Sequence, residues 1–272
     1  MMQDNRIHHM DAIEGLRRID ANTVDLVITD PPYNIASKNT TTMQGSKPVS
    51  TYQAWGQWDV FHPFDYKLLI NQVISEAYRV LRPGGSFYMF TAQEDNGYFI
   101  HQAVKRGFVL RRVLAIVRQN PLPSMSKRNW RSGFELCMYL VKPDRECTCS
   151  QRGCSRKHRG SLRTFNFLSQ QECINVFYYP IGIKKTRHPT EKPQAFIERL
   201  VKVSSNPGDL VVDPFVGGGT TAAACQKLGR RYVCFDANAD YVEMAQNRVV
   251  SIEKEVSNAS TNSMVSEGGD SI

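Results

Sequence analysis

Strand-like and helix-like runs alternate along this chain, and the alternation limits its folds more than any other feature. The run 24–29 is rich in β-branched residues and stops at two consecutive prolines, as a buried strand leading into a loop does. Between residues 66 and 81 apolar side chains recur at helical spacing, and Pro83-Gly84-Gly85 ends the pattern. Such alternation predicts an α/β fold with a doubly wound, mostly parallel sheet.

The same patterns predict the other elements and the domain limits. Helices are expected over 191–205, 220–228 and about 240–254, and strands over 86–90, 110–117, 136–141, 210–212 and 232–235. One domain is expected over residues 1–256, with an inserted basic segment at about 118–187. The tail, 257–272, is rich in Ser, Asn and Gly and is expected to be disordered.

Positive charge is concentrated in one part of the chain. The net charge is +8, and residues 105–163 alone hold 15 Lys or Arg against three acids. A local excess of this size indicates a polyanionic partner. The chain has no apolar run of about eighteen residues and no apolar core of a secretory signal near Met1, so a cytoplasmic protein is expected.

A glycine-rich turn predicts a small-molecule site. Asp213-Pro-Phe-Val-Gly-Gly-Gly-Thr220 follows a predicted strand and opens a predicted helix, so backbone amides would face a ligand there. Asp236, at the end of the next strand, has a position suited to ribose hydroxyls. Taken alone, the turn also fits a dinucleotide fingerprint, or a tight turn that binds no ligand.

The loop Asp30-Pro31-Pro32-Tyr33 carries groups suited to an exocyclic amino group. The amine of a nucleobase is a poor nucleophile, and the Asp30 carboxylate and Pro31 carbonyl could accept its two hydrogens as positive charge develops. Two prolines stiffen the loop, and Tyr33 offers a ring on which an extruded base can stack. The alternative is a rigid turn in which the aspartate is only a cap.

Five segments in order make the sequence resemble the amino-methylating DNA methyltransferases of the permuted β group, over roughly residues 7–252. They are 30–34, the helix exit 79–85, Arg118-Gln-Asn-Pro-Leu-Pro123, His188-Pro-Thr-Glu-Lys-Pro193, and Phe215-x-Gly217-x-Gly219.

The resemblance implies a circularly permuted, Rossmann-like fold that binds S-adenosylmethionine and double-stranded DNA, and it is compatible with a homodimer. Asp30, Pro31, Pro32 and Tyr33 would hold the flipped target base. The residues implied in cofactor binding are Asp11, Thr190, Lys192, Asp213, Phe215, Gly217, Gly219, Thr220 and Asp236. Two positions depart from the pattern: Met10 replaces the glycine before Asp11, and Phe134 stands where relatives often have histidine.

Asp, rather than Ser, before Pro-Pro-Tyr favours adenine N6 over cytosine N4 as the target, and RNA is a further alternative. The resemblance also suggests a place in a restriction-modification system. Two other classes stay open: a nicotinamide-dependent oxidoreductase, which leaves the diproline loop unexplained, and a noncatalytic DNA-binding relative, against which the intact Asp30 argues.

The inserted basic segment predicts DNA contacts and allows a metal site. Its candidate DNA-binding residues are Arg118, Lys127, Arg128, Arg156, Lys157 and Arg159, although a solvated basic face is the alternative for any one of them. Cys147, Cys149, Cys154 and His158 have a spacing compact enough for one structural zinc ion, with Cys173 as a substitute ligand. A flexible loop with surface thiols is the other interpretation.

Overall fold

The structure is a computed structural model that describes residues 2–34, 41–44, 47–50, 59–121, 130–144, 163–179 and 191–266. Of residues 41–44, 47–48 and 255–266 it describes the backbone alone. The helices are α1 (Ala12–Arg17), α3 (Pro63–Val80), α4 (Asn96–Arg106), α5 (Gln194–Ser204), α6 (Thr220–Leu228) and α7 (Ala239–Ser266). The strands are β1 (Arg6–His9), β2 (Val24–Thr29), β3 (Thr41–Gln44), β4 (Lys47–Ser50), β5 (Leu81–Thr91), β6 (Val109–Arg118), β7 (Phe134–Val141), β8 (Val176–Tyr179), β9 (Leu210–Asp213) and β10 (Arg231–Asp236).

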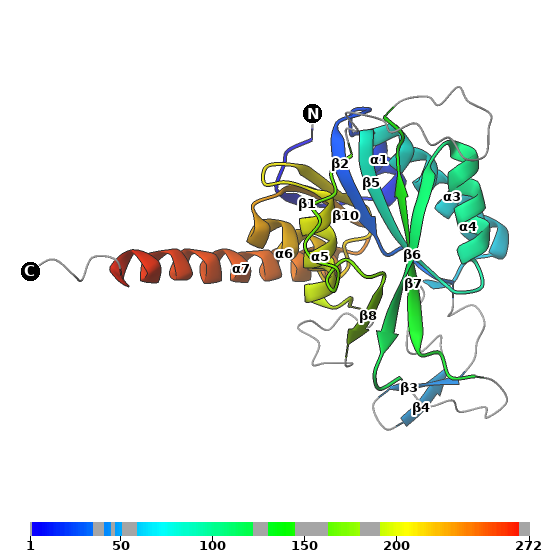
Figure 1. Ribbon diagram of the computed structural model, residues 1–272. Coiled ribbons are helices and arrows are strands. Elements are labelled where there is room, and N and C mark those ends of the chain that lie inside the picture. Colours follow the sequence, from blue (N-terminus) through cyan, green and yellow to red (C-terminus); the bar gives the residue numbers. More distant parts are fainter. Residues whose placement is uncertain are drawn as a thin grey trace, which may run out of the picture.

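Eight strands form the central sheet in the order β1-β10-β9-β2-β5-β7-β6-β8 (Figure 1). All neighbours run parallel except β7, which is antiparallel to both β5 and β6. Strands β3 and β4 form a separate antiparallel pair. The prediction of a mostly parallel α/β sheet is therefore confirmed.

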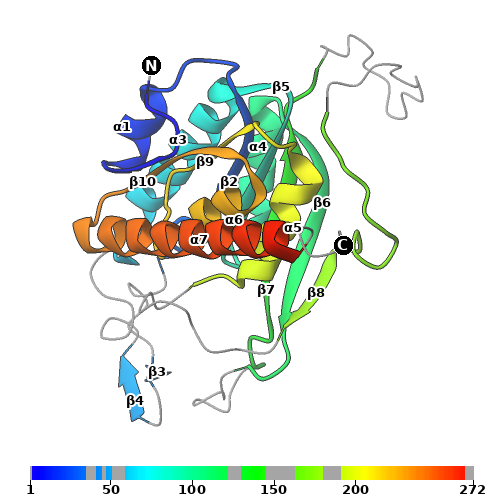
Figure 2. The ribbon, with the colours of Figure 1, turned by 90° about the vertical axis from the view of Figure 1, so that its left-hand side faces the viewer.

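Helices cover both faces of the sheet, which makes three layers (Figures 1 and 2). On one face α5, α6 and α7 pack against strand residues such as Ile28 and Phe90. On the other face α1, α3 and α4 pack against residues such as Val27 and Phe87. Because neighbouring residues of β2 and β5 enter opposite layers, these central strands are buried almost throughout.

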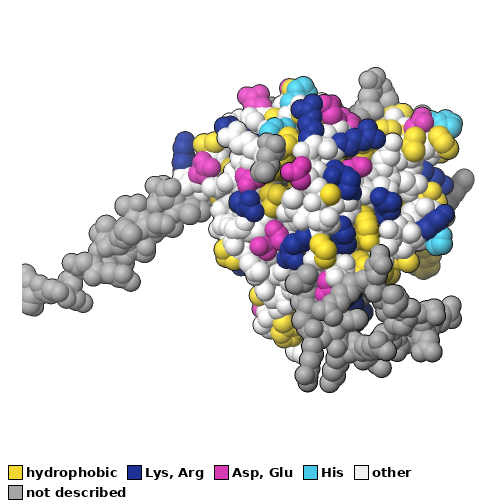
Figure 3. Space-filling model, turned by 90° about the horizontal axis from the view of Figure 1, so that it is seen from above, with side chains coloured by type: hydrophobic (Ala, Val, Ile, Leu, Met, Phe, Trp, Pro, Cys, Tyr) yellow, Lys and Arg dark blue, Asp and Glu magenta, His cyan; other side chains and the backbone are white. Residues whose placement is uncertain are grey.

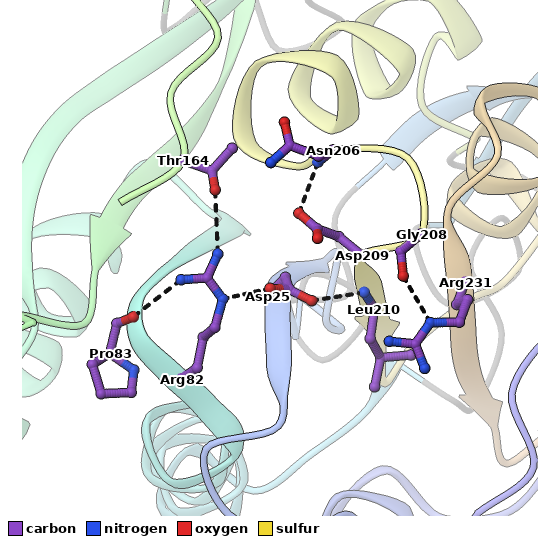
Figure 4. Close-up of polar contacts among 9 residues, drawn as sticks. All are labelled: Asp25, Arg82, Pro83, Thr164, Asn206, Gly208, Asp209, Leu210 and Arg231. Atoms are coloured by element: carbon purple, nitrogen blue, oxygen red, sulfur yellow. Dashed lines mark hydrogen bonds and ion pairs between the residues drawn. The ribbon is translucent and has the colours of Figure 1, made fainter. Parts of the chain in front are cut away.

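A polar network joins several strands at the amino edge of the sheet (Figure 4). Arg82, at the start of β5, forms an ion pair with Asp25 of β2 and donates a 3.2 Å hydrogen bond to Thr164. The second Asp25 carboxylate oxygen accepts the backbone N–H of Leu210, in β9, at 2.8 Å. The described segment 163–179, which lies inside the range expected to be an insertion, is thus fixed at this edge by Thr164.

The described residues on either side of segment 145–162 lie at the amino edge. Because β7 is antiparallel, it ends with Val141 opposite Ser86, near the start of β5, and the chain returns with Thr164 bonded to Arg82. Figure 3 views the molecule from this side and shows basic and acidic side chains interspersed. The residues that flank segment 145–162 therefore lie on the side of the sheet away from the carboxyl ends of β2 and β9.

Helix α7 is longer than expected. It continues to Ser266, so 257–266 are helical, where disorder was expected for the whole tail. No glycine or proline occurs between Ala239 and Ser266 to end the helix. Figure 1 shows its later turns extending beyond the other helices. The short elements β1, α1, α4 and β8 were not predicted, and β7 and β8 are sheet strands inside the range 118–187 that was expected to be an insertion.

No helix in the described part of the chain is both long and apolar enough to cross a bilayer.

Candidate functional site

The carboxyl edge of the sheet carries one large cleft. Asp30 follows β2, while Asp213 and Asp236 end β9 and β10, and because these strands are parallel the three aspartates meet at one edge. The cleft has a volume of about 820 Å³. The expected site residues in its lining are Asp11, Asp30, Pro31, Pro32, Tyr33, Lys192, Asp213, Phe215, Gly217, Thr220 and Asp236.

Asp59 holds the diproline loop in shape. This aspartate, 1% exposed, accepts the backbone N–H of Tyr33 at 2.8 Å and that of Asn34 at 2.7 Å. Asn34 has the left-handed φ of 54°, and its side-chain oxygen accepts the N–H of Phe61 at 2.9 Å. The loop therefore depends on a residue 26 positions away, which the sequence did not single out.

Both carboxylate oxygens of Asp30 already have partners. Oδ1 accepts the Tyr33 hydroxyl at 2.6 Å, and Oδ2 lies 2.6 Å from Nζ of Lys192. Burial and the adjacent Asp30 carboxylate hold the pKa of Tyr33 well above its usual range, so the phenol keeps the proton that it donates. The sequence predicted a role for the Tyr33 ring alone, whereas the hydroxyl also orients Asp30.

Lys192 is the centre of a chain of charges. Its ammonium also lies 2.9 Å from Oε2 of Glu135, whose other oxygen forms an ion pair with Arg118. The ammonium sits over the Phe90 ring at 4.8 Å and the Tyr33 ring at 5.3 Å. Arg118, expected to contact DNA, is thus engaged with Glu135 at this edge. Glu135 was not identified from the sequence as a site residue.

The glycine turn is tied to Asp236. The N–H of Gly217 donates to Oδ2 of Asp236 at 2.9 Å, and the N–H of Asn238 donates to Oδ1 at 2.9 Å. Burial raises the pKa of Asp236, although both amide hydrogen bonds act in the opposite direction. Gly219 lies behind the cleft rather than in its lining, with φ of 79° and its Cα facing Ala245 of α7.

Asp213, which begins the glycine turn, is a deeply buried acid. It is 4% exposed and accepts hydrogen bonds from the Thr221 hydroxyl at 2.6 Å and the Phe215 N–H at 3.1 Å. Burial raises its pKa to about 7 despite those hydrogen bonds.

Arg248 of α7 joins two of the matched motifs, and the sequence did not reveal it. Its guanidinium donates to the Gly218 carbonyl at 2.9 Å and to Gln194 at 2.8 Å, and it forms a 2.7 Å ion pair with Glu191. Both side chains of that ion pair are less than a tenth exposed. The segment that carries Lys192 is thereby fixed to the glycine turn.

The charge of the lining fits S-adenosylmethionine better than a dinucleotide. Among the described lining residues there are eight carboxyl side chains and one cation, Lys192. A cofactor with a sulfonium and an ammonium group gains from such surroundings, whereas a pyrophosphate would be repelled. Gly217, at φ of 48°, also permits the close backbone approach that such a ligand needs. The acids concerned are Asp11, Asp30, Asp59, Asp65, Glu191, Asp213, Asp236 and Asp240.

Several predicted residues lie outside the described part of the chain: Thr190, the candidate DNA contacts Lys127, Arg128, Arg156, Lys157 and Arg159, and the zinc candidates Cys147, Cys149, Cys154 and His158. Within the residues that the structure does describe, no group of His, Cys, Asp and Glu is arranged for a metal ion. Cys173 has a free thiol, which accepts the N–H of Leu168 at 3.4 Å.

Relatives of known activity resemble most of the chain. It is 29% identical over 259 residues to the DNA adenine methyltransferase YhdJ of Escherichia coli (strain K12), covering 89% of this chain and 82% of the relative. It is 27% identical to the type II methyltransferase M2.DpnII of Streptococcus pneumoniae, covering 89% and 88%.

Two solved structures share the fold. The complex of M1.HpyAVI with S-adenosylmethionine gives a TM-score of 0.60 at 23% identity, covering 90% of this chain and 98% of that one. The cytosine-N4-specific PvuII DNA methyltransferase gives 0.65 at 16% identity, covering 95% and 94%. Over residues 24–247 the chain matches a family described as DNA methylase, of the N6 and N4 type. The chain therefore belongs to the N6/N4 DNA methylase family and is a DNA methyltransferase that uses S-adenosylmethionine.

Proposed function

We propose that this methyltransferase acts on N6 of adenine in double-stranded DNA, and that Asp30, Pro31, Pro32 and Tyr33 hold the flipped base. The observation that carries the proposal is the position of this loop, which lines the same cleft as the glycine turn between Asp213 and Thr220. A base held at one motif therefore lies beside a cofactor bound at the other.

The chemistry assigned to the loop is stabilisation of the amino nitrogen during transfer. When bound, S-adenosylmethionine supplies an electrophilic methyl group on a sulfonium ion. The Asp30 carboxylate and the Pro31 carbonyl accept the two amino hydrogens while the nitrogen–carbon bond forms and the carbon–sulfur bond breaks. The nitrogen then loses one proton, which the Asp30 carboxylate is assigned to accept.

The lining of the cleft supports the cofactor assignments. Asp236 would accept ribose hydroxyls, as it already accepts two backbone amides and sits at the mouth of the glycine turn. Asp11, whose Oδ1 caps α1 by accepting N–H groups at 2.9 and 3.1 Å, also lines the cleft and is assigned to the adenine of the cofactor. Thr190 and Lys192 are assigned to the methionine end.

Adenine is favoured over cytosine by two observations. An aspartate, rather than a serine, begins the Pro-Pro-Tyr loop, and the relative at 29% identity is named as a DNA adenine methyltransferase. The fold itself does not discriminate, because the PvuII enzyme is specific for cytosine N4. Cytosine N4 is therefore the second candidate.

One experiment separates these candidates. Unmethylated genomic DNA, treated with the protein and S-adenosylmethionine, is read by single-molecule sequencing, with the Asp30→Ala variant as the matched control. We expect N6-methyladenine within one sequence context and none with the variant. N4-methylcytosine instead would move the assignment to the second candidate, and an unmodified genome would refute both.

The remaining proposals concern the insertion and the assembly. A structural zinc ion bound by Cys147, Cys149, Cys154 and His158 is tested by elemental analysis of untagged protein, with Cys149→Ser as the control. DNA contacts by Lys127, Arg128, Arg156, Lys157 and Arg159 predict an affinity that falls steeply with salt. A homodimer and a cytoplasmic location stay predictions from the sequence.

A further inference from the structure

The Lys192 ammonium stands where the proposed reaction needs an amino group. A target amine must donate a hydrogen bond to the Asp30 carboxylate, yet Oδ2 of that carboxylate lies 2.6 Å from Nζ of Lys192, and Oδ1 accepts the Tyr33 hydroxyl. The nitrogen of Lys192 is cationic and tetrahedral, as the target nitrogen becomes during transfer. Lys192 thus resembles the reacting amine in both charge and shape.

The Glu135 carboxylate is a second anion close to this ammonium. Glu135 Oε2 lies 2.9 Å from Nζ, only slightly farther than Asp30, and Glu135 is the less exposed of the two carboxylates, at 13% against 22%. Arg118 holds the other oxygen of Glu135. Lys192 can therefore leave Asp30 and keep an ion pair, without crossing the cleft and without any change in net charge.

We propose that Lys192 occupies the amine position of the empty site and that Glu135 withdraws it when the target base enters. Glu135 is then a positioning residue that acts through Lys192. This inference rests on the role assigned to Asp30 above. On entry of the base, an amino hydrogen replaces the ammonium at Oδ2 of Asp30, while Lys192 remains bound to Glu135 close to the Tyr33 ring.

The test compares two DNA duplexes, both bound in the presence of S-adenosylhomocysteine. One contains the target base in the recognition sequence found by sequencing, and the other has an abasic position in its place. Glu135→Gln keeps the shape of the side chain but removes its charge, so Lys192 should stay on Asp30. We expect the dissociation constant of the intact duplex to rise about tenfold or more, and that of the abasic duplex to change little.

Two further variants make the outcome decisive. Glu198→Gln makes the same substitution in a more exposed lysine pair, with Lys227 at 3.0 Å. Because this pair lies outside the cleft, the variant should leave both dissociation constants unchanged. The double variant Glu135→Gln/Lys192→Met lacks the competing ammonium. At a concentration of S-adenosylhomocysteine that calorimetry shows to saturate this variant, it should recover the affinity for the intact duplex to within about threefold of the wild type.

Failure to recover, or an equal loss of affinity for both duplexes in Glu135→Gln, would overturn the inference. Either result would mean that Glu135 supports the fold or the DNA contact instead. The proposed function is tested separately, because it fails if the wild-type chain forms no N6-methyladenine in genomic DNA, whatever the affinities of the Glu135 variants.

Discussion

Gly219 and Gly229 bound the same helix and provide a matched test of how the cofactor turn is built. Both have left-handed φ, 79° at the N-terminal end of α6 and 70° at its C-terminal end. An alanine in that region costs about 1 kcal/mol or slightly more. A Cβ on Gly229 meets no atom within 4 Å, whereas on Gly219 it lies 2.7 Å from Cα of Ala245 and 2.8 Å from its Cβ.

The overlap at Gly219 involves the backbone of α7, so relief requires the helix or the turn to move. Overpacking of this kind typically adds ~1–3 kcal/mol. Gly229→Ala should therefore lower the free energy of unfolding by about 1 kcal/mol, and Gly219→Ala by about 2–5 kcal/mol. Urea unfolding followed by circular dichroism measures both, and calorimetry measures binding of S-adenosylmethionine.

Because Gly217 and Gly218 line the cleft on the same turn, Gly219→Ala should also weaken cofactor binding, and Gly229→Ala should not. Equal destabilisation by the two variants would refute the argument from the Ala245 contact. Normal cofactor binding by a strongly destabilised Gly219→Ala variant would show that the displacement does not reach the cleft.

Three further substitutions follow from the site. Asp30→Ala should abolish methyl transfer and leave the dissociation constant of the cofactor within about threefold of the wild type, because the role of Asp30 begins when the base is bound. Substantial turnover at saturating DNA would contradict this role. Asp236→Ala should raise the calorimetric dissociation constant of the cofactor by about tenfold or more while DNA affinity holds, and unchanged binding would remove Asp236 from the site. Arg248→Met should lower the free energy of unfolding, measured in urea, by about 3–5 kcal/mol, since the buried Glu191 loses its guanidinium partner. Lys227→Met removes a half-exposed lysine and should lower it by at most about 1 kcal/mol. An equally small effect of Arg248→Met would refute the linking role of Arg248.

The proximity of the diproline loop and the glycine turn was predictable, because parallel strands end at a common edge of the sheet. Asp30 and Asp213 are far apart in the sequence, yet each follows a run that reads as a buried strand, and a right-handed α/β arrangement brings such ends together. The periodic helix at 66–81 was likewise found, as α3. Local pattern was sufficient for these features.

The residues that fix the site were not predictable, because their partners come from distant packing. Asp59 follows a polar segment without periodicity, and only the folded loop shows that it binds two amides of the loop after Asp30. Arg248 is one basic residue of a helix, and Glu135 one residue of a strand, until packing places each beside its partner. From the sequence, Arg118 in an ion pair cannot be distinguished from an arginine that binds phosphate.

Short elements were missed for a different reason. Strand β1 has four residues, three of them charged or histidine, and gains its place only by pairing with β10. Strand β8 also has four residues and pairs only with β6 along the sheet edge. Strands of four residues are too short for an alternation of apolar and polar residues to be recognised.

The buried carboxyl of Asp213 predicts a stability that falls as the pH rises. Its pKa is about 7 in the folded chain, against an ordinary value of 3.8. Between these two values the folded state binds more protons than the unfolded state, so the free energy of unfolding decreases with pH over that window and levels off above pH 7. Each pH unit inside the window corresponds to about 1.4 kcal/mol, and Asp236, whose pKa burial also raises, acts with the same sign.

Comparison with Asp213→Asn isolates this contribution, because the amide does not titrate. Urea unfolding at pH 5, 6, 7 and 8 should give a difference between wild type and variant that shifts against the wild type from pH 5 to about 7 and then stays constant. The test depends on how the difference in the free energy of unfolding changes with pH. A uniform loss of stability in the variant, from a weaker hydrogen bond with Thr221, therefore does not affect it. Parallel pH curves for the two proteins would mean that Asp213 is ionised in the folded chain at pH 5, and that its two hydrogen bonds outweigh its burial.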